Sequence, residues 1–373
     1  MKHLTYPIAL CLALSASTAL AGGNERSTQS AMVLFEPGNY AELSFTSVSP
    51  NVSGTGAGTV PNPAQPTPGQ DSGNMAESHS QMGLSYKHQF NERLSAALIY
   101  EMPFGADIHY PAGTTYFNRG AQADLNIHSL TGLLKYTTPS NFSIFGGLRY
   151  QTMDATARVP IVSNYGIVTS KDSGLGHVLG VAYEKPEIAL RVALTYNSQI
   201  DHTVQATETT VAMGTTITPE SFYTPESVNL EFQSGIAKDT LLFGSIRWVG
   251  WSKFDLSPQQ YVIATGIPIV SYADDTVTYN LGLGRKFNEN WSGAVTLGYE
   301  KSNGGFSANL GPVDGNWSIG LGGSYKKGNV KISAGVKYIH LGDAQTTLAG
   351  GLPASDFTNN HAVAAGLKIG YHF

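Results

Sequence analysis

The chain of 373 residues has little charge and only one cysteine. Charged residues make up 13% of it, against roughly 25% in ordinary soluble domains, which disfavours a conventional soluble enzyme. The single cysteine, Cys11, lies near the N-terminus, so the rest of the chain has no residue for a disulfide, a thiolate metal site or a cysteine nucleophile. The net charge of −5 gives no indication of a nucleic-acid partner.

Long apolar runs and catalytic motifs are missing as well. After the N-terminus there is no stretch of about 20 apolar residues, which argues against a helical membrane protein. The sequence contains no G-x-S-x-G elbow. Its 10 histidines are scattered, without the close spacing of a metal site. We therefore expect no enzymatic activity, no cofactor and no bound metal.

The N-terminus has the pattern of a secretory signal peptide. Lys2 and His3 supply a basic start, and an apolar stretch runs from Ile8 to Leu14. Residues 19–21 form an A-x-A cleavage site before Gly22. The apolar stretch is too short to span a bilayer, so we expect residues 1–21 to be removed on secretion.

From Asn39 onward, apolar residues recur with a period of two, which predicts β-strands. In the last segment Val363, Leu367 and Ile369 share one face, while Lys368 and Gly370 share the other. There are about fourteen such segments, an even number as in bacterial single-chain barrels. The predicted strands are 39–49, 77–89, 93–102, 123–137, 141–153, 174–185, 187–203, 221–236, 240–252, 274–286, 290–301, 315–327, 329–341 and 360–373.

The connections between these segments alternate between short and long. The short ones are tight turns at 90–93, 138–141, 184–187, 237–240, 288–290 and 326–329. The long ones are 50–76, 103–122, 154–173, 204–220, 253–273, 302–314 and 342–359. Short periplasmic turns and long extracellular loops are typical of outer-membrane barrels. A soluble β-sandwich is the alternative, although nothing in that fold requires strict alternation.

The pattern therefore predicts an all-β fold, a transmembrane antiparallel β-barrel of about 14 strands with a short N-terminal plug segment. We assign residues 22–38 to a hatch-like segment and 39–373 to the barrel, in the Gram-negative outer membrane. The first and last strands should pair near Tyr40, leaving no exposed edge. The expected surroundings are outer-membrane lipid and lipopolysaccharide, and we expect a monomer.

Several charged residues fall on the faces opposite the apolar stripes, where a barrel would turn them into its lumen. They are Lys87, Lys135, Arg149, Arg191, Glu231, Arg247, Lys337 and Lys368. Such residues commonly pair with one another along a pore wall. Alternatively, the basic ones Arg149, Arg191, Arg247 and Lys337 grip an anionic headgroup, because Arg binds carboxylates bidentately.

Several motifs resemble those of the FadL-type outer-membrane transporters. One is the strand start Thr224-Pro225-Glu226-Ser227-Val228, and a second is the strand 241–255 with its ending Trp248-Val249-Gly250-Trp251-Ser252-Lys253-Phe254-Asp255. Pro103-Phe104-Gly105 with Tyr110 behind it is similar to a third family segment. The resemblance covers about residues 36–373. The chain departs from the family before its first strand, where Glu36-Pro37-Gly38 stands in place of an Asn-Pro-Ala motif.

The resemblance implies uptake of hydrophobic molecules, such as long-chain fatty acids or aromatic hydrocarbons, through the barrel and sideways into the bilayer. Apolar solutes need an apolar binding surface in the extracellular loops, and two long loops are richer in apolar residues than solvated loops usually are. We name as candidate substrate-binding residues Phe104, Ile108, Tyr110, Phe117, Phe254, Tyr261 and Ile263, with the basic side chains Arg149, Arg191, Arg247 and Lys337. Packing of loop upon loop would explain the same apolar residues.

Two other functions stay open at this stage. A general diffusion porin for small polar solutes would need a constriction with basic residues facing acidic ones, but loop 103–122 holds only Asp107 and Arg119. A barrel scaffold or adhesin would bind a partner through its loops, for instance through the Gly- and Pro-rich stretch 53–73.

Overall fold

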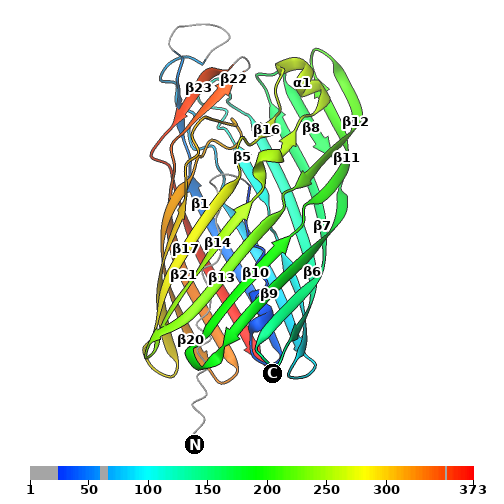
Figure 1. Cartoon of the computed structure of the whole chain (residues 1–373). Helices are drawn as coiled ribbons and strands as arrows, with labels where there is room; N and C mark the ends of the chain where they lie inside the picture. Colours follow the sequence, from blue (N-terminus) through cyan, green and yellow to red (C-terminus); the bar gives the residue numbers. More distant parts are fainter. Residues whose placement is uncertain (1–23, 59–65, 349–350) are drawn as a thin grey trace, which may run out of the picture.

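Neighbouring strands pair along almost the whole chain, and the first pairs with the last. The computed structural model describes residues 24–58, 66–348 and 351–373, so the predicted signal peptide at 1–21 lies outside the described residues. The chain closes into an antiparallel barrel of 14 strands (Figure 1). These strands are β1 (Tyr40–Asn51), β3 (His79–Gln89), β4 (Leu94–Glu101), β6 (Gln122–Thr137), β7 (Phe142–Val159), β9 (Asp172–Lys185), β10 (Leu190–Asn197), β13 (Ser227–Ala237), β14 (Thr240–Val249), β17 (Thr276–Lys286), β18 (Trp291–Glu300), β20 (Asn316–Lys327), β21 (Val330–Leu341) and β24 (His361–His372).

The closing seam runs between β1 and β24. Tyr40 is paired with His372 at one end of the seam and Asn51 with His361 at the other. The prediction that the last strand returns to the first near Tyr40 is therefore confirmed. No free strand edge is left in the membrane-spanning part of this seam, which is how a barrel satisfies its backbone groups in lipid.

The barrel is apolar outside and polar inside. Along β24, Val363, Leu367 and Ile369 are exposed, whereas Ala362 and Ala364 are buried. The same exposure of large apolar side chains continues around the wall, as at Leu43, Leu98, Leu134, Leu148, Leu179, Leu281, Leu297 and Leu321. The predicted lumen charges Lys87, Lys135, Arg149, Glu231, Arg247 and Lys337 are all buried. A soluble sandwich would show the reverse arrangement, so the belt identifies a membrane-spanning wall.

The prediction that residues 204–220 form a loop is wrong, because this stretch continues the barrel wall as strands. β11 (Ile200–Thr210) follows β10, and β12 (Gly214–Thr224) leads into β13; the two form a hairpin at the upper end of the barrel (Figure 1). The interruption between β12 and β13 falls at Pro225, which has no N–H to donate to a ladder. β8 (Tyr165–Thr169), inside the predicted loop 154–173, pairs with β7 and with β11.

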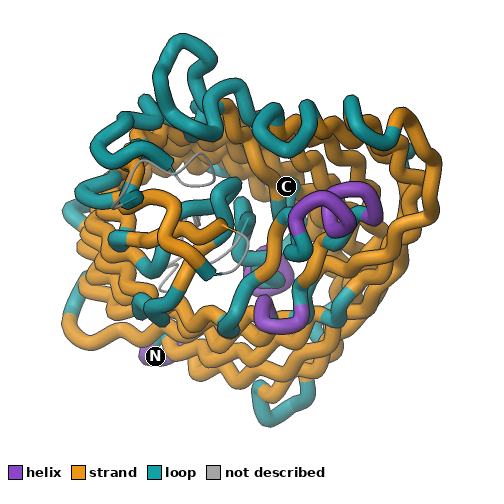
Figure 2. The backbone as a smooth tube through the Cα atoms, turned by 90° about the horizontal axis from the view of Figure 1, so that it is seen from above, coloured by secondary structure: helices purple, strands orange, loops and turns teal. Residues whose placement is uncertain are grey.

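The other long connections carry short elements and fold over the upper mouth of the barrel (Figure 2). The strands among them are β2 (Gly54–Gly56), β5 (Gly105–His109), β15 (Asp255–Leu256), β16 (Val270–Ser271), β19 (Phe306–Ser307), β22 (Ala344–Leu348) and β23 (Leu352–Phe357).

The helical elements of the described chain as a whole are η1 (Met32–Phe35), η2 (Pro186–Ile188), η3 (Trp251–Lys253) and α1 (Gln259–Thr265). No helix in the described ranges is long and apolar enough to cross a membrane.

The N-terminal segment, residues 24–38, contacts side chains that point into the barrel. Lys87 on β3 donates to the carbonyl of Glu36 at 2.6 Å, and Arg191 on β10 donates to that of Phe35 at 3.4 Å. The Phe35 ring packs edge-on against Phe145 of β7, with centroids 5.8 Å apart. These partners come from widely separated strands, so the segment runs through the lumen between them.

Candidate functional site

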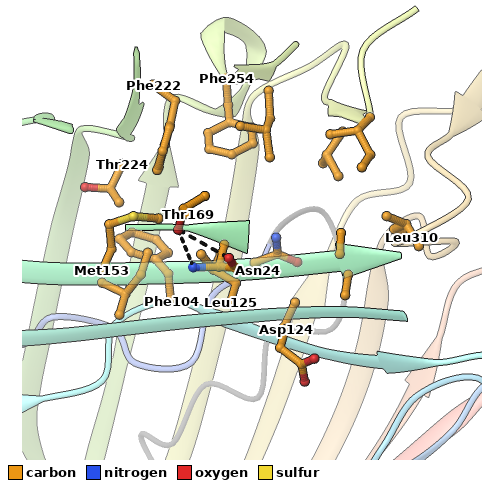
Figure 3. Close-up of a pocket in the computed structure, with 18 of the residues that line it drawn as sticks. Asn24, Phe104, Asp124, Leu125, Met153, Thr169, Phe222, Thr224, Phe254 and Leu310 are labelled. Atoms are coloured by element: carbon orange, nitrogen blue, oxygen red, sulfur yellow. Dashed lines mark hydrogen bonds between the residues drawn. The ribbon is translucent and has the colours of Figure 1, made fainter. Parts of the chain in front are cut away.

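The upper half of the barrel holds an apolar pocket with about 920 Å³ of empty space, which includes space open to solvent (Figure 3). Its wall comes from β6, β7 and β8 on one side and from β11 and β12 on another. Residues 251–270, which connect β14 to β17, cover it. The apolar side chains lining it are Phe104, Ala106, Ala123, Leu125, Ile127, Met153, Ala155, Ala157, Ile167, Val204, Phe222, Pro225, Trp251, Phe254, Leu256, Ile269, Val270 and Leu310.

An aromatic cluster forms one side of the pocket around Trp251. The chain turns at η3, directly after β14, and this turn buries Trp251 to 2% exposure. The Trp251 ring lies edge-on to Phe104 at 5.6 Å and to Phe254 at 5.5 Å, and 4.9 Å from Tyr272. Burial raises the pKa of the Tyr272 hydroxyl, so this side of the pocket stays neutral. Edge-on pairs of this kind hold the rings in fixed positions.

The pocket has no basic lining residue in the described part of the chain. Asp124 and Glu220 are its only charged lining residues there. Asp124 lies on β6 between the inward residues Ala123 and Leu125, and Figure 3 shows its carboxyl group directed away from the other labelled side chains. Glu220 on β12 accepts a hydrogen bond from the backbone N–H of Gln259 at 3.3 Å. The cavity therefore suits an uncharged apolar molecule.

The cover of the pocket is attached to the β11–β12 hairpin through α1. Glu208, fully buried on β11, accepts hydrogen bonds from the N–H of Gln260 at 3.0 Å and of Tyr261 at 3.3 Å. The hydroxyl of Tyr165 donates to the same carboxylate at 3.0 Å. Gln260 of α1 also donates to the carbonyl of Gly214 at 3.2 Å and to the hydroxyl of Thr216 at 2.9 Å, both on β12.

The N-terminal segment forms the floor. Arg247 on β14 donates to Glu25 at 2.7 and 2.5 Å, and both side chains are almost completely buried. Arg26 pairs with Asp107 on β5. Ser30 donates to Glu231 on β13 at 2.7 Å. Below the apolar pocket, the lumen is therefore crossed by a network of charged and polar side chains.

The barrel wall is interrupted beside this floor. Between β4 and β5 the residues 102–104 turn inward, and the carbonyl of Pro103 accepts from the N–H groups of Arg26 and Ser27 at 2.8 and 3.2 Å. The adjacent strand β3 pairs with β4 only from Leu84 to Gln89, so residues 79–83 have no ladder partner on this side in the described structure.

A second cavity of about 660 Å³ adjoins the pocket and has His79, beside this interruption, in its lining. It shares the lining residues Asn24, Ala106 and Leu310 with the pocket and extends to His79 on β3. On the outer surface Met82 of β3 is 50% exposed, within the apolar belt. The unpaired stretch of β3 therefore carries an outward-facing apolar side chain of this belt.

The structure brings two of the predicted apolar residues together, because Phe104 and Phe254 both line the pocket. Ile108 lines the second cavity. Tyr110, Phe117 and Tyr261 belong to an apolar cluster under the upper loops. Ile263 on α1 is 66% exposed and lines neither cavity. The binding role of each of these residues stays a prediction.

The four predicted basic residues lie outside the pocket lining. Arg149 pairs with Glu101 at 3.4 Å, and Arg191 donates to Gln233 at 2.8 Å. Arg247 holds Glu25, as described above. Lys337 lines a separate polar cavity of about 460 Å³ together with Arg247, Glu25 and Glu300.

The sequence did not identify several residues that line the pocket, among them Trp251, Met153, Val204 and Phe222. A usable signal was present at Met153, where the alternation places a large apolar side chain on the lumen face. The described ranges contain no group of three or more His, Cys, Asp or Glu residues that could hold a metal ion.

A closed barrel with an apolar belt and a polar lumen defines a multi-pass β-barrel of the Gram-negative outer membrane. Its fold is that of the FadL-type transporters of hydrophobic compounds. A Pseudomonas aeruginosa FadL homologue superimposes with a TM-score of 0.74 at 15% identity, over 92% of each chain. The P. putida toluene transporter TodX gives 0.65 at 12%, over 95% of this chain and 94% of TodX. The Ralstonia pickettii toluene transporter TbuX gives 0.61 at 14%, over 91% and 90%.

The sequence comparisons contribute less. No curated protein sequence matches the chain. A family model described as the autotransporter β-domain matches residues 265–373, which contain the last five membrane-spanning strands. At these identities, the structural likeness establishes the fold, and the fold expected from the sequence motifs is confirmed.

Proposed function

We propose that this protein is a passive outer-membrane channel for the uptake of hydrophobic molecules. The observation that carries the proposal is an apolar pocket of about 920 Å³ inside a lumen that is otherwise polar. Water-filled pores do not need such a pocket, whereas an apolar solute gains about 25 cal/mol for each Å² that it buries there. The structural neighbours named as toluene transporters support the same class of substrate.

The two adjoining cavities define the route that we propose for a solute through the barrel. A solute collects in the upper loops, passes under the cover formed by residues 251–270, and occupies the pocket. It then moves through the second cavity, past Asn24 and Ala106, to the wall interruption beside residues 79–83. Because the N-terminal segment crosses the lumen below, the outlet is sideways into the bilayer, where an apolar molecule is more stable than in water.

Within this class, the lining favours uncharged molecules. Long-chain fatty acids belong to the hydrophobic class, and their acyl chains suit the apolar wall. Their carboxylate would find no Lys or Arg among the lining residues of the described pocket. A carboxylate moved into such surroundings is strongly destabilised. We infer that the substrate class is uncharged, comprising aromatic or aliphatic hydrocarbons and their neutral derivatives.

Filling the pocket tests the proposal. Ala155 on β7 lines it, so Ala155→Phe places a ring in the cavity. We expect the initial rate of toluene uptake by cells expressing the variant to fall about tenfold, because the bound position is sterically blocked. The matched control is Val168→Phe on β8, whose side chain is 56% exposed on the outer face. Equal uptake by wild type and Ala155→Phe, with both barrels folded, would contradict the proposal.

A general diffusion porin is the second candidate, and the polar cavity lined by Glu25, Arg247, Glu300 and Lys337 favours it. Conductance of the purified protein in planar bilayers separates the two. We expect no large steady conductance steps, since the N-terminal segment crosses the lumen; large ion-selective steps would favour the porin.

We further propose that the protein is a monomer in contact with membrane lipid and lipopolysaccharide. A mass measurement in mild detergent tests the monomer.

A further inference from the structure

One polar atom in the pocket lining lacks a partner. The indole nitrogen Nε1 of Trp251 is buried, and no hydrogen-bond acceptor in the described structure lies within reach of it. It is the only side-chain atom of this kind among the described lining residues of the pocket. An indole N–H is a donor only, and leaving a buried donor unpaired is unfavourable. Because Trp251 lines the cavity, an acceptor on a ligand placed beside its ring would satisfy this donor.

The hydroxyl and carboxyl groups around Trp251 are already engaged. The hydroxyl of Thr169 accepts from the N–H of Ala155 at 2.9 Å and donates to its carbonyl at 3.2 Å (Figure 3). Thr224 donates to Gln151 at 2.8 Å, and Glu220 accepts from Gln259. Each of these groups therefore has a partner of its own, and none of them accepts a bond from Trp251 Nε1.

Packing fixes the position of the Trp251 ring. Its three aromatic neighbours lie 4.9 to 5.6 Å away, so the indole cannot rotate to find a partner elsewhere without breaking those contacts. The donor is therefore preorganised, which lowers the cost of ordering it when a ligand binds.

The charge of the lining decides which acceptor fits. A carboxylate would accept the Trp251 hydrogen bond but would meet Glu220 and no basic lining residue. An uncharged oxygen accepts the same bond without that repulsion. Resting on the proposed uptake function, we propose that the pocket selects uncharged apolar molecules carrying one acceptor oxygen, a ketone, ester, ether or alcohol, which Trp251 binds.

Three planar ligands of equal heavy-atom count test this selection. They are acetophenone, with a carbonyl; α-methylstyrene, with a methylene in its place; and benzoate, with a carboxylate. Binding to the purified full-length barrel is measured by calorimetry, with protein-free micelles as the blank. We expect acetophenone to bind about tenfold more tightly than α-methylstyrene, and benzoate not to bind.

Trp251→Phe removes the donor and keeps an aromatic ring. We expect the binding of acetophenone to weaken about tenfold, to the level of α-methylstyrene. The binding of α-methylstyrene itself should stay unchanged. That factor corresponds to ~1.4 kcal/mol, in the range of one hydrogen bond. Trp291→Phe, at a ring that is 53% exposed on the outer wall, is the matched control and should change nothing.

The outcomes separate the two levels of the proposal. An unchanged ratio of acetophenone to α-methylstyrene in Trp251→Phe overturns the role of the donor, as does an equal loss of both ligands. Benzoate binding as tight as that of acetophenone overturns the selection against charge. If wild type binds none of the three ligands, the uptake function itself is contradicted.

Discussion

Replacing Arg247 by Ala should loosen the floor of the pocket. Arg247 donates to the Glu25 carboxylate, to the carbonyl of Thr28 at 3.0 Å and to the amide oxygen of Gln29 at 3.1 Å. These bonds join β14 directly to the N-terminal segment. Without the guanidinium, the Glu25 carboxylate is left buried and uncompensated.

The size of the effect follows from that burial. Glu25 and Arg247 are 4% and 3% exposed, and removing one partner of a buried pair costs about 3–5 kcal/mol. Since ~1.4 kcal/mol is a factor of ten, the released form of residues 24–30 should become more than a hundredfold more populated. The turn η1 should stay in place, because Phe35 still packs on Phe145.

Single-channel recording in planar bilayers measures this release. We expect brief, large openings in Arg247→Ala that wild type lacks, because a vacated lumen conducts ions. The double variant Glu25→Gln with Arg247→Met removes both charges and should abolish these openings. Arg285→Ala is the control, since in the described part of the chain Arg285 bonds only to an exposed turn, through Lys238 and Thr240. A folded Arg247→Ala barrel with wild-type conductance would refute the reasoning.

Two further predictions concern stability and the cover. An added Cβ at Gly282 would lie 2.3 Å from the ring of Phe243 on the paired strand, so Gly282→Ala should destabilise the barrel by about 1–3 kcal/mol in urea titrations. Gly366→Ala is the control, because its nearest atom lies 3.6 Å away, and equal midpoints for the two variants would count against this packing argument. Glu208→Ala removes the acceptor of three hydrogen bonds and should speed amide hydrogen exchange in α1 at least tenfold, while Glu208→Gln, which keeps an oxygen, does so less. Unchanged exchange in Glu208→Ala would show that α1 is held by other contacts.

The alternation of apolar residues predicted the membrane-spanning strands because lipid requires an apolar side chain at every second position. The signal stops where lipid stops. β11 and β12 are rich in threonine, as at Thr207, Thr209 and Thr216, because both faces of this hairpin lie above the belt. Alternation of apolar residues therefore predicts a loop where the structure has this hairpin.

The pocket was only partly predictable for a different reason. Phe104 and Phe254 stand in recognisable motifs, whereas Phe222 meets the pocket only because the hairpin and the covering segment fold together. Alternation also placed the basic residues in the lumen, but it cannot tell a ligand from a salt-bridge partner. Arg149 and Arg247 are held by Glu101 and Glu25, which lie far from them in the sequence.

The seam between β1 and β24 has a consequence for the order of assembly. Its partners, such as Tyr40 and His372, are the most distant pairs in the described wall, so this seam has the highest contact order and the largest loop-closure entropy. It can form only after β24, the last of the described strands, has been synthesised, and its closure entropy favours pairing of the local hairpins first. Until then Glu25 and Arg247 face an open sheet, and the N-terminal segment can dock sideways onto β13 and β14 without threading. A barrel closed early would admit the same segment only end-on, so late closure of the seam leaves time for the floor to dock before the lumen is enclosed.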